Sequence, residues 1–268
     1  MPDSAIASTQ DEPSASELSA LGGLIRNAVR IVVLTGAGIS TESGIPDYRG
    51  PNGVWSTGKP PTIGDFMDNE ESRRAYWQRR LESYPTLLAA QPNAAHLALV
   101  ELEERGKLSG IVTQNIDGLH QRAGSTQERV IELHGSAHSI RCTSCGTVFS
   151  GDEVQQWLMD GIAYPVCPVC GGILRTTTVL FGEPLPPRAL DRSIELTRNA
   201  DLLLIIGSSL VVNPAAKLPL IAKRSGAPVA IVNRTETRQD HLADLRLVGS
   251  AGNVIPKAVA LALGSGPK

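Results

Sequence analysis

Several signals that would place the chain in a membrane or outside the cell are missing from its sequence. No stretch approaches the roughly 18 consecutive apolar residues that a membrane-spanning helix needs. The first 15 residues (MPDSAIASTQDEPSA) have neither a basic start nor an apolar core, so they do not resemble a secretion signal and are expected to form a disordered tail. We therefore expect a cytoplasmic protein with reduced thiols and without a membrane partner.

The sequence also lacks the features of a nucleic-acid-binding protein and of a serine hydrolase. The 25 Lys and Arg residues nearly balance the 27 Asp and Glu residues, with no block of like charge, so a general nucleic-acid surface is not expected. The G-x-S-x-G turn of serine hydrolases is absent as well. With 268 residues, of which 41% are hydrophobic and 19% charged, the chain can bury one large core and carry a small second module.

Short apolar runs alternate with helix-like segments along most of the chain. The run IVVLT is almost wholly apolar, as in a strand buried on both faces. Strands are predicted at Ile31–Thr35, Ile111–Thr113, Val130–Leu133, Leu202–Ile206, Val229–Val232 and Leu245–Val248. Helices are predicted at roughly 15–29, after a Ser14-x-x-Glu17 capping box, and at Asn93–Arg105 and Ala215–Arg224. This alternation predicts an α/β fold with a Rossmann-like, mostly parallel sheet covered by helices on both faces.

Two segments interrupt the alternation. Residues 56–90 are polar and are expected to form a helical insertion, whereas residues 141–175 contain all four cysteines. The expected division is a tail (1–15), a Rossmann-like nucleotide-binding domain (16–55, 91–140 and 176–268), and a small domain (56–90 and 141–175).

The four cysteines form two C-x-x-C pairs. Cys142 and Cys145 make the first pair, Cys167 and Cys170 the second, and 21 residues separate them. Each pair offers two thiolates to a tetrahedral ion, so the pattern predicts one zinc site. Because four thiolates leave no position for water, the zinc is expected to be structural rather than catalytic. A redox pair is the alternative.

A glycine-rich turn, Gly36-Ala37-Gly38-Ile39-Ser40, follows the first predicted strand directly. Such a turn lets backbone N–H groups approach a pyrophosphate. Thr41 replaces the third glycine of the dinucleotide fingerprint, and no acidic residue lies about 20 residues further on, which disfavours an ordinary nicotinamide dehydrogenase. A tight turn without a ligand is the alternative. The following GIPDYRG segment (44–50) contains an acid, an aromatic ring and an arginine, which could contact the same ligand. The alternative is a surface loop in which Arg49 pairs with Asp47 and no ligand binds.

Polar side chains follow two further strands. Gln114, Asn115 and Asp117 follow one predicted strand, and His134 follows the next. Ligands bind at the carboxyl ends of parallel strands, where these groups could hold a ribose and a carboxamide. A histidine there can act as a general base, although a lone histidine is more often structural. The other four histidines are expected to be structural or exposed: His96 in a helix, His120 in a loop, His138 and His241 at the surface.

Taken together, these residues resemble the sirtuin family. The matching motifs span nearly all of residues 30–260: GAGIS (36–40), GIPDYRG (44–50), TQNIDGLH (113–120), ELHG (132–135), the cysteine pairs, LFGE (180–183), GSSL (207–210) and IVN (231–233). The resemblance implies an NAD-dependent deacylase acting on acyl-lysine proteins or peptides. It also implies NAD+ as co-substrate, one structural Zn²⁺, and nicotinamide, free lysine and an O-acyl-ADP-ribose as products.

The resemblance also implies roles for particular residues. The catalytic residues would be His134 and Asn115. NAD+ would contact Gly36, Ala37, Gly38, Ser40, Asp47, Tyr48, Arg49, Gln114, Asn115, Ile116, Asp117, Gly207, Ser208, Ser209, Asn233, Arg234, Thr235 and Ala251. The peptide would pair with two edges formed by Val179, Leu180, Phe181, Gly182 and Glu183 and by Val211, Val212 and Asn213.

Two features leave the substrate open. Arg175-Thr176-Thr177 stands where many sirtuins have Arg-Pro-Asp, and class II and class IV features are mixed. Tyr76-x-x-Arg79 resembles the pair with which desuccinylating sirtuins grip an acidic acyl group, and helix spacing would put both side chains on one face. The alternative is that Tyr76 packs its helix onto the sheet and that deacetylation is the main activity.

The sequence is also compatible with three other functions. The first is a mono-ADP-ribosyltransferase, the second a non-catalytic sensor of NAD or O-acyl-ADP-ribose, and the third an oxidoreductase. His134 and Asn115 argue against a sensor, which needs neither. The sequence does not predict an oligomeric state.

Overall fold

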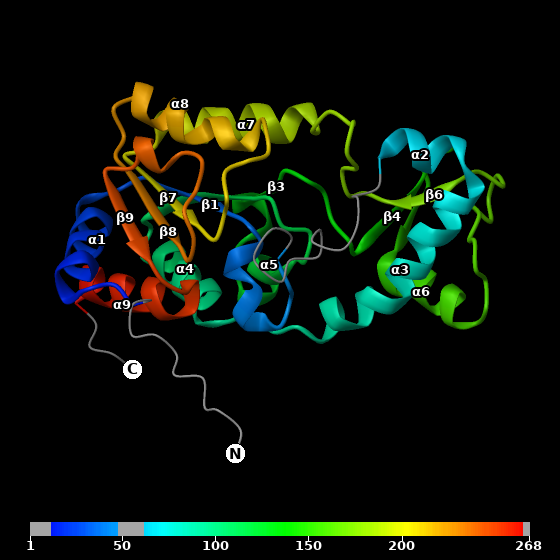
Figure 1. Cartoon of the computed structure of the whole chain (residues 1–268), viewed down its shortest axis with the longest axis horizontal. Helices are drawn as coiled ribbons and strands as arrows, with labels where there is room; N and C mark the ends of the chain where they lie inside the picture. The colour runs from blue at the N-terminus through cyan, green and yellow to red at the C-terminus, as the bar shows by residue number, and fades with distance from the viewer. Residues whose placement is uncertain (1–11, 48–61, 265–268) are drawn as a thin grey trace, which may run out of the picture.

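A six-stranded parallel sheet forms the centre of the computed structural model, which describes residues 12–47 and 62–264 (Figure 1). Its order is β3-β2-β1-β7-β8-β9, and every pair of neighbours is parallel. The strands are β1 Ile31–Thr35, β2 Leu108–Thr113, β3 Val130–Glu132, β7 Leu202–Ile206, β8 Val229–Asn233 and β9 Leu245–Val248. The order reverses between β1 and β7, and such a switch point opens a crevice at the carboxyl ends of the strands.

Helices cover both faces of this sheet, as predicted. In Figure 1 α7 Pro187–Asn199 and α8 Leu218–Arg224 lie on one side, and α1 Ala15–Asn27, α4 Ala94–Glu104 and α9 Ala251–Leu263 lie on the other. Successive side chains of a strand point to opposite faces. Ile31 and Val33 accordingly join the core under α1, α4 and α9, while Val32 and Leu34 join the core under α7 and α8. The doubly buried strand predicted from IVVLT is confirmed.

Two of the three predicted helix starts are confirmed. Ser14 caps α1, because its hydroxyl accepts from Glu17 N (3.2 Å) while the Glu17 carboxylate accepts from Ser14 N (2.8 Å). Asn93 caps α4 by accepting from Ala95 N at 3.0 Å. The segment predicted as one helix from Ala215 begins instead with a 3₁₀ turn, and the α-helix starts at Leu218.

A second, smaller module lies at the opposite end of the molecule from α1 (Figure 1). Its antiparallel sheet has the order β5-β4-β6, with β4 Ser139–Cys142, β5 Val148–Ser150 and β6 Leu174–Thr176. Helices α2 Ile63–Asp68, α3 Glu70–Ala89 and α6 Gly151–Met159 complete it, and Trp77 fills its core with Ile140, Val154 and Leu174. The expected helical insertion and cysteine segment therefore share one hydrophobic core.

Short helices connect these elements. They are α5 Leu119–Ala123 and the 3₁₀ turns η1 Ala37–Ile39, η2 Thr41–Ser43, η4 Gln127–Arg129, η5 Ala215–Lys217 and η6 Asp240–Leu242. Within the described parts of the chain, no helix combines the length and the apolar character needed to span a membrane.

Candidate active site and metal centre

A cavity of about 500 Å³ opens at the carboxyl ends of the parallel strands. The segments that follow β1, β2, β3, β7 and β8 all contribute to it, which is the location that the switch point predicts. Predicted site residues that line the cavity are Gly36, Ala37, Gly38, Asp47, Gln114, Asn115, Ile116, His134, Val179, Leu180, Phe181, Gly182, Glu183, Gly207, Ser208, Ser209, Val212, Asn213, Asn233, Arg234, Thr235 and Ala251.

The glycines of the first turn are required for close packing against the loop after β7. Gly36 N donates to Ile206 O (3.1 Å) and Gly38 N to Gly207 O (2.8 Å). A Cβ on Gly38 would lie 2.6 Å from Gly207 Cα, and Gly207 itself has a φ of +63°. The expectation that these glycine amides point at a phosphate is therefore corrected for Gly36 and Gly38, whose N–H groups hold the two loops together.

The side chain of Asn115 is held by Ser40, which is 75 residues away in the sequence, and through Ser40 by Asp117. Its Nδ2 donates to Ser40 Oγ (3.1 Å), and Ser40 Oγ donates to Asp117 Oδ2 (2.7 Å). Leu119 N donates to the other Asp117 oxygen at 3.0 Å. Ser40 and Asp117 are buried and do not line the cavity formed by the described residues, so their contact with a ligand stays a prediction. In this structure they fix the amide of Asn115.

His134 lies at the cavity wall with its tautomer set by the backbone. Nδ1 is 2.8 Å from the carbonyl oxygen of Gln114, which can only accept, so Nδ1 carries the proton and Nε2 carries the lone pair. A neutral imidazole of this form is suited to act as a general base. The next residue, Gly135, adopts a φ of +70°, and a Cβ there would lie 2.1 Å from Thr177 O. The turn that follows His134 therefore packs closely against Thr177, in the segment that leads to Val179.

The segment Val179–Glu183 forms the part of the cavity wall next to His134. Val179 N donates to His134 O (2.9 Å), and Ile63 N donates to Phe181 O (2.9 Å), so the segment is tied to both modules. The Glu183 carboxylate pairs with Arg175 through Nη1 (2.5 Å) and Nη2 (2.7 Å). Val211, predicted as part of the facing edge, does not line the cavity of the described residues, whereas Val212 and Asn213 do.

Several cavity residues were not predicted from the sequence: Thr41, Thr178, Leu185, Val232 and Gly249. Thr41 had been noted only as the residue that replaces a fingerprint glycine, and its hydroxyl donates to Gly38 O (3.1 Å). Thr178 directly precedes the predicted peptide edge, so extending that edge by one residue would have found it. Tyr48 and Arg49 of the predicted cofactor loop lie outside the described residues.

The structure places the predicted acyl-recognition pair away from the cavity that the described residues form. The Tyr76 hydroxyl bonds to that of Thr176, and its ring packs edge-on against Phe66, with centroids 4.9 Å apart. Arg79 is exposed, and neither residue lines the cavity. The reason is helical periodicity, because the buried face of α3 carries Trp77 together with Arg80 and Tyr84, and Arg79 points away from it. Tyr76 and Arg79 therefore do not face one pocket among the described residues, and their recognition of an acyl group stays a prediction.

Hydrogen bonds hold two polar side chains, Arg80 and His138, between α3 and the loop after β3. The Arg80 guanidinium donates to Ala137 O (3.0 Å) and Gly151 O (2.9 Å), and burial lowers its pKa. His138, predicted to be exposed, is half-buried, with Nε2 2.8 Å from Asp117 O and Nδ1 3.1 Å from the Tyr84 hydroxyl. Both residues join α3 to the loop that follows β3.

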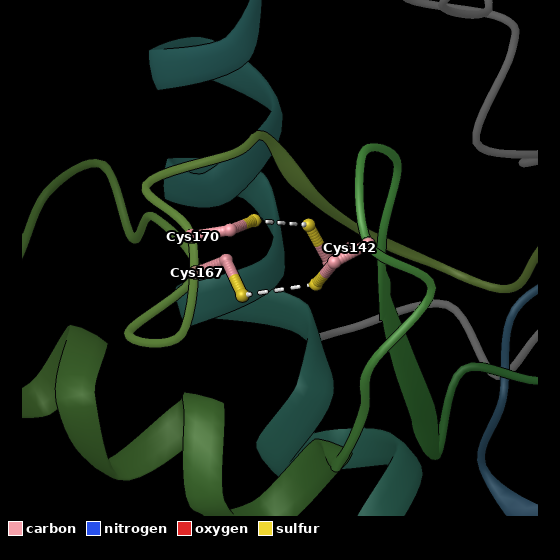
Figure 2. Close-up of side chains that lie close together, drawn as sticks. Cys142, Cys167 and Cys170 are labelled. Atoms are coloured by element: carbon pink, nitrogen blue, oxygen red, sulfur yellow. Dashed lines mark hydrogen bonds between the residues drawn. The ribbon is translucent and has the colours of Figure 1, made fainter.

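The four cysteines converge at the edge of the small module (Figure 2). All four sulfur atoms lie within 4.8 Å of one another, with Cys142–Cys170 at 3.5 Å and Cys145–Cys167 at 3.7 Å. A tetrahedral zinc ion with Zn–S bonds of about 2.3 Å requires sulfurs about 3.8 Å apart, whereas a disulfide requires about 2.05 Å. The donor set and its spacing therefore fit one structural Zn²⁺, and the redox alternative is disfavoured.

Known proteins resemble this chain over nearly its whole length. The Sir2 family matches residues 36–214. A protein named NAD-dependent protein deacetylase 1 from Bradyrhizobium diazoefficiens is 43% identical over 90% of this chain and 94% of its own. NAD-dependent protein deacylase 2 from Archaeoglobus fulgidus is 42% identical over 91% and 95%.

Solved structures agree in fold. A Sir2 enzyme described in terms of mechanism and regulation has a TM-score of 0.86 at 40% identity, covering 94% of this chain and 99% of its own. A complex of Sir2 with a p53 peptide and NAD+ has a TM-score of 0.80 at 40% identity, covering 90% and 96%. The parallel sheet, the cavity at its carboxyl edge and the four-cysteine centre thus occur together in a chain that belongs to the Sir2, or sirtuin, family.

Proposed function

We propose that this chain is an NAD-dependent protein lysine deacylase that works in the cytoplasm and forms nicotinamide, free lysine and an O-acyl-ADP-ribose. The main support for the proposal is that His134, Asn115 and Gln114 line one cavity. Two glycine-containing loops (36–38 and 207–209) and the proposed peptide edge (179–183) line the same cavity. The relatives named as NAD-dependent deacetylases and deacylases match this chain along nine-tenths of its length.

The residues of the Rossmann-like part would hold NAD+ along the strand ends. The loops Gly36–Gly38 and Gly207–Ser209 lie where the phosphates would be held, and Asn233–Thr235 with Ala251 lie toward the adenosine. Gln114 and Asn115 would position the nicotinamide ribose. We assign NAD+ binding to a domain formed by residues 16–55, 91–140 and 176–268. Residues 56–90 and 141–175 form the small domain, which would support the peptide.

The protein's catalytic contribution is positioning and proton transfer. Bound NAD+ supplies a ribose carbon that becomes electrophilic as its bond to nicotinamide breaks. His134, with its lone pair on Nε2, accepts a proton from a ribose hydroxyl and so promotes attack of that hydroxyl on the captured acyl group. Asn115, fixed through Ser40 and Asp117, presents its amide without a reorganisation cost.

Acyl-lysine proteins are the proposed substrates, and an acetyl group the favoured acyl group. An extended peptide would pair with the backbone of Val179–Glu183 on one side and Val211–Asn213 on the other, which gives modest sequence selectivity. The described cavity lining holds one cation, Arg234, on the proposed adenosine side, and Arg175 is occupied by Glu183. A succinyl carboxylate would therefore meet no unoccupied cation among the described residues of the peptide edge.

The test is to incubate the protein with NAD+ and the acetyl or succinyl form of one lysine peptide, and to identify the products by mass. We expect nicotinamide and O-acetyl-ADP-ribose, with kcat/KM higher for the acetyl peptide. His134→Ala should lower kcat by about 10²–10⁴ without loss of zinc or fold, while His241→Ala, at an exposed histidine, should not change it. ADP-ribose attached to protein, with the peptide still acylated, would identify a transferase instead.

A further inference from the structure

A row of polar side chains joins the small module to the loop that carries Asn115. The Tyr84 hydroxyl, from α3, donates to Asp152 Oδ1 of α6 at 2.9 Å and lies 3.1 Å from His138 Nδ1. On the other side of the same ring, His138 Nε2 lies 2.8 Å from the carbonyl oxygen of Asp117. Tyr84, Asp152 and His138 do not line the cavity formed by the described residues, and the proposed reaction uses none of them.

The three contacts together require one particular set of hydrogens. A carbonyl oxygen can only accept, so His138 Nε2 carries a hydrogen toward Asp117 O. A carboxylate also only accepts, so the single hydroxyl hydrogen of Tyr84 is used on Asp152. At its contact with His138 Nδ1 the Tyr84 oxygen is then the acceptor, and Nδ1 carries a hydrogen too. All three bonds therefore form at once only when the imidazole is protonated.

Tyr84 retains its hydrogen in this environment. Burial, and then the bond to Asp152 and its charge, raise the pKa of Tyr84 to about 12. The Arg80 guanidinium, whose Cζ lies 3.8 Å from the centroid of the Tyr84 ring, opposes this rise. The hydroxyl therefore remains the donor to Asp152 throughout the physiological range of pH.

Charged groups on several elements surround His138. The acidic ones are Asp152 of α6, Glu132 of β3 and Asp117 after β2, and Arg80 of α3 is the opposing cation. Burial raises the pKa of the half-buried Glu132, and a positive charge on His138 counteracts that rise. A charge on the ring therefore interacts with carboxylates on three elements as well as with the guanidinium.

The segment that carries His138 holds the backbone directly after Asn115. Ala137 N donates to Ile116 O at 3.0 Å, and the next residue, His138, bonds to the next carbonyl oxygen, that of Asp117. Ile116 and Asn115 both line the cavity. The row of side chains therefore ties the small module to the two peptide units that follow a proposed catalytic residue.

We propose that protonated His138 clamps the loop of Asn115 to the small module and so positions Asn115 at the cavity. His138 acts through the Asp117 carbonyl and does not line the cavity of the described residues, so it is a positioning residue rather than a catalytic one. The part of the proposal that concerns turnover rests on the proposed deacylase function. A displacement of about 1 Å can change a rate by about a hundredfold, so a looser loop is expected to lower kcat.

The clamp depends on pH with a defined sign. When the ring loses its Nδ1 hydrogen at rising pH, the lone pairs of Nδ1 and of the Tyr84 oxygen face each other unless Tyr84 turns away from Asp152. One bond of the row is then lost, so the clamp stabilises the fold at low pH and weakens as the pH rises. His134 works in the opposite sense, because a general base must be unprotonated. We expect kcat to be limited by His134 at low pH and by the clamp at high pH.

The experiment measures what the Tyr84 hydroxyl contributes to Tm at two pH values, in the full zinc-loaded chain without substrate. Tyr84→Phe keeps the ring but removes both hydroxyl bonds, and we expect its loss of Tm to be larger by about 2 °C or more at about pH 6 than at about pH 8.5. In a His138→Gln background, which has no imidazole to protonate, the loss should be the same at both pH values. Tyr164→Phe is the matched control, because Tyr164 also lies in the small module beside an arginine, with Arg73 Cζ 5.4 Å from its ring centroid.

Two outcomes of this measurement would overturn the clamp. One is a loss of Tm for Tyr84→Phe that does not depend on pH, and the other is a pH dependence that persists in the His138→Gln background. If His138→Gln does not fold, Asp152→Asn at an exposed position serves as the second background. Its amide can donate to the Tyr84 oxygen and so frees the hydroxyl hydrogen for a neutral ring, and the pH dependence should disappear there too.

Turnover gives a second measurement, which a purely structural role would not affect. Per folded, zinc-loaded molecule, we expect His138→Gln to lower kcat for the acetyl peptide by about threefold or more at about pH 6.5, with the peptide KM within about twofold. The ratio of parent to variant should shrink by about pH 8.5, because the parent loses the same clamp there. A folded His138→Gln protein with parental kcat at every pH would overturn the positioning role. An inactive parent would count against the proposed function, while the Tm measurements would still decide the clamp.

Discussion

Replacing Glu183 by Gln is a direct test of how the peptide edge is held. The change keeps the size of the side chain but removes the charge that faces Arg175. The side chains of Arg175 and Glu183 are 13% and 22% exposed, and the carboxylate also accepts from Leu180 N at 2.7 Å. The substitution therefore leaves a largely buried guanidinium without its counter-charge.

The expected cost lies between two limits. Breaking a fully buried pair costs about 3–5 kcal/mol, and exposed pairs contribute about 0–1 kcal/mol. Since this pair is mostly but not wholly buried, and Arg175 keeps its bond to Thr178 O, we expect Glu183→Gln to lower the free energy of unfolding by about 2 kcal/mol. The matched control is Glu70→Gln, because the side chains of Glu70 and Arg74 are 56% and 52% exposed. Its expected cost is below about 0.5 kcal/mol.

The pH dependence gives a second measurement with a defined sign. Burial alone would raise the pKa of Glu183, but the bonds from Arg175 and Leu180 N outweigh it and hold the pKa below the ordinary 4.5. A carboxylate with a depressed pKa stabilises the fold above its unfolded pKa, and this contribution is lost as the pH falls through the folded value.

Denaturant unfolding of parent and Glu183→Gln proteins should therefore differ by a constant amount from about pH 7 to pH 5 and by less below 4.5. The peptide KM should rise more than the KM for NAD+. A variant no less stable than Glu70→Gln, or a difference that grows with acid, would refute the reasoning.

Two further predictions concern the metal centre and the turn after His134. Cys145→Ala should lower zinc content and Tm together, because a closed zinc site contributes folding energy directly; freshly purified parent without zinc on metal analysis would contradict the assignment. Gly135→Ala should lower the free energy of unfolding by more than about 2 kcal/mol, since its Cβ would lie 2.1 Å from Thr177 O. Gly226→Ala is the control in denaturant unfolding, because Gly226 also has a positive φ (+82°) but no atom within 4 Å of a Cβ, and a loss as large as that of Gly135→Ala would remove the steric argument.

The sequence was sufficient to predict the six strands of the parallel sheet and the four clustered cysteines, because each signal is local. A strand that is buried on both faces, such as β1, is a continuous run of apolar residues. Two C-x-x-C pairs identify the four ligands of a zinc site directly. The order of the strands in the sheet has no such local signal, because β1 lies beside β7 although more than 160 residues separate them. Only the resemblance to a family, and not the run of residues, could indicate that the loops Gly36–Gly38 and Gly207–Ser209 meet.

The structure differs most from the predictions where one local pattern had two interpretations. Tyr76 and Arg79 share helical spacing, but so do Trp77, Arg80 and Tyr84, and the second set is the buried one. An aromatic residue at each end of an i, i+7 row indicates the core-facing side better than an i, i+3 pair in an arginine-rich stretch. The contacts of the buried histidines could not be predicted, because His120 Nε2 contacts Thr35 of β1 and the His120 ring lies beside that of His96 on α4.

The departure from the family motif at Thr176 and Thr177 also has a structural account. A proline and an aspartate are usual at these positions, and the two threonines use their hydroxyl groups instead. Thr176, 5% exposed, bonds through its hydroxyl to those of Tyr76 and Thr178. The Thr177 hydroxyl donates to Ser136 O at 3.1 Å. The segment is thereby anchored to α3 on one side and to the turn after His134 on the other, and Tyr76 supports the edge along which the peptide is expected to pair.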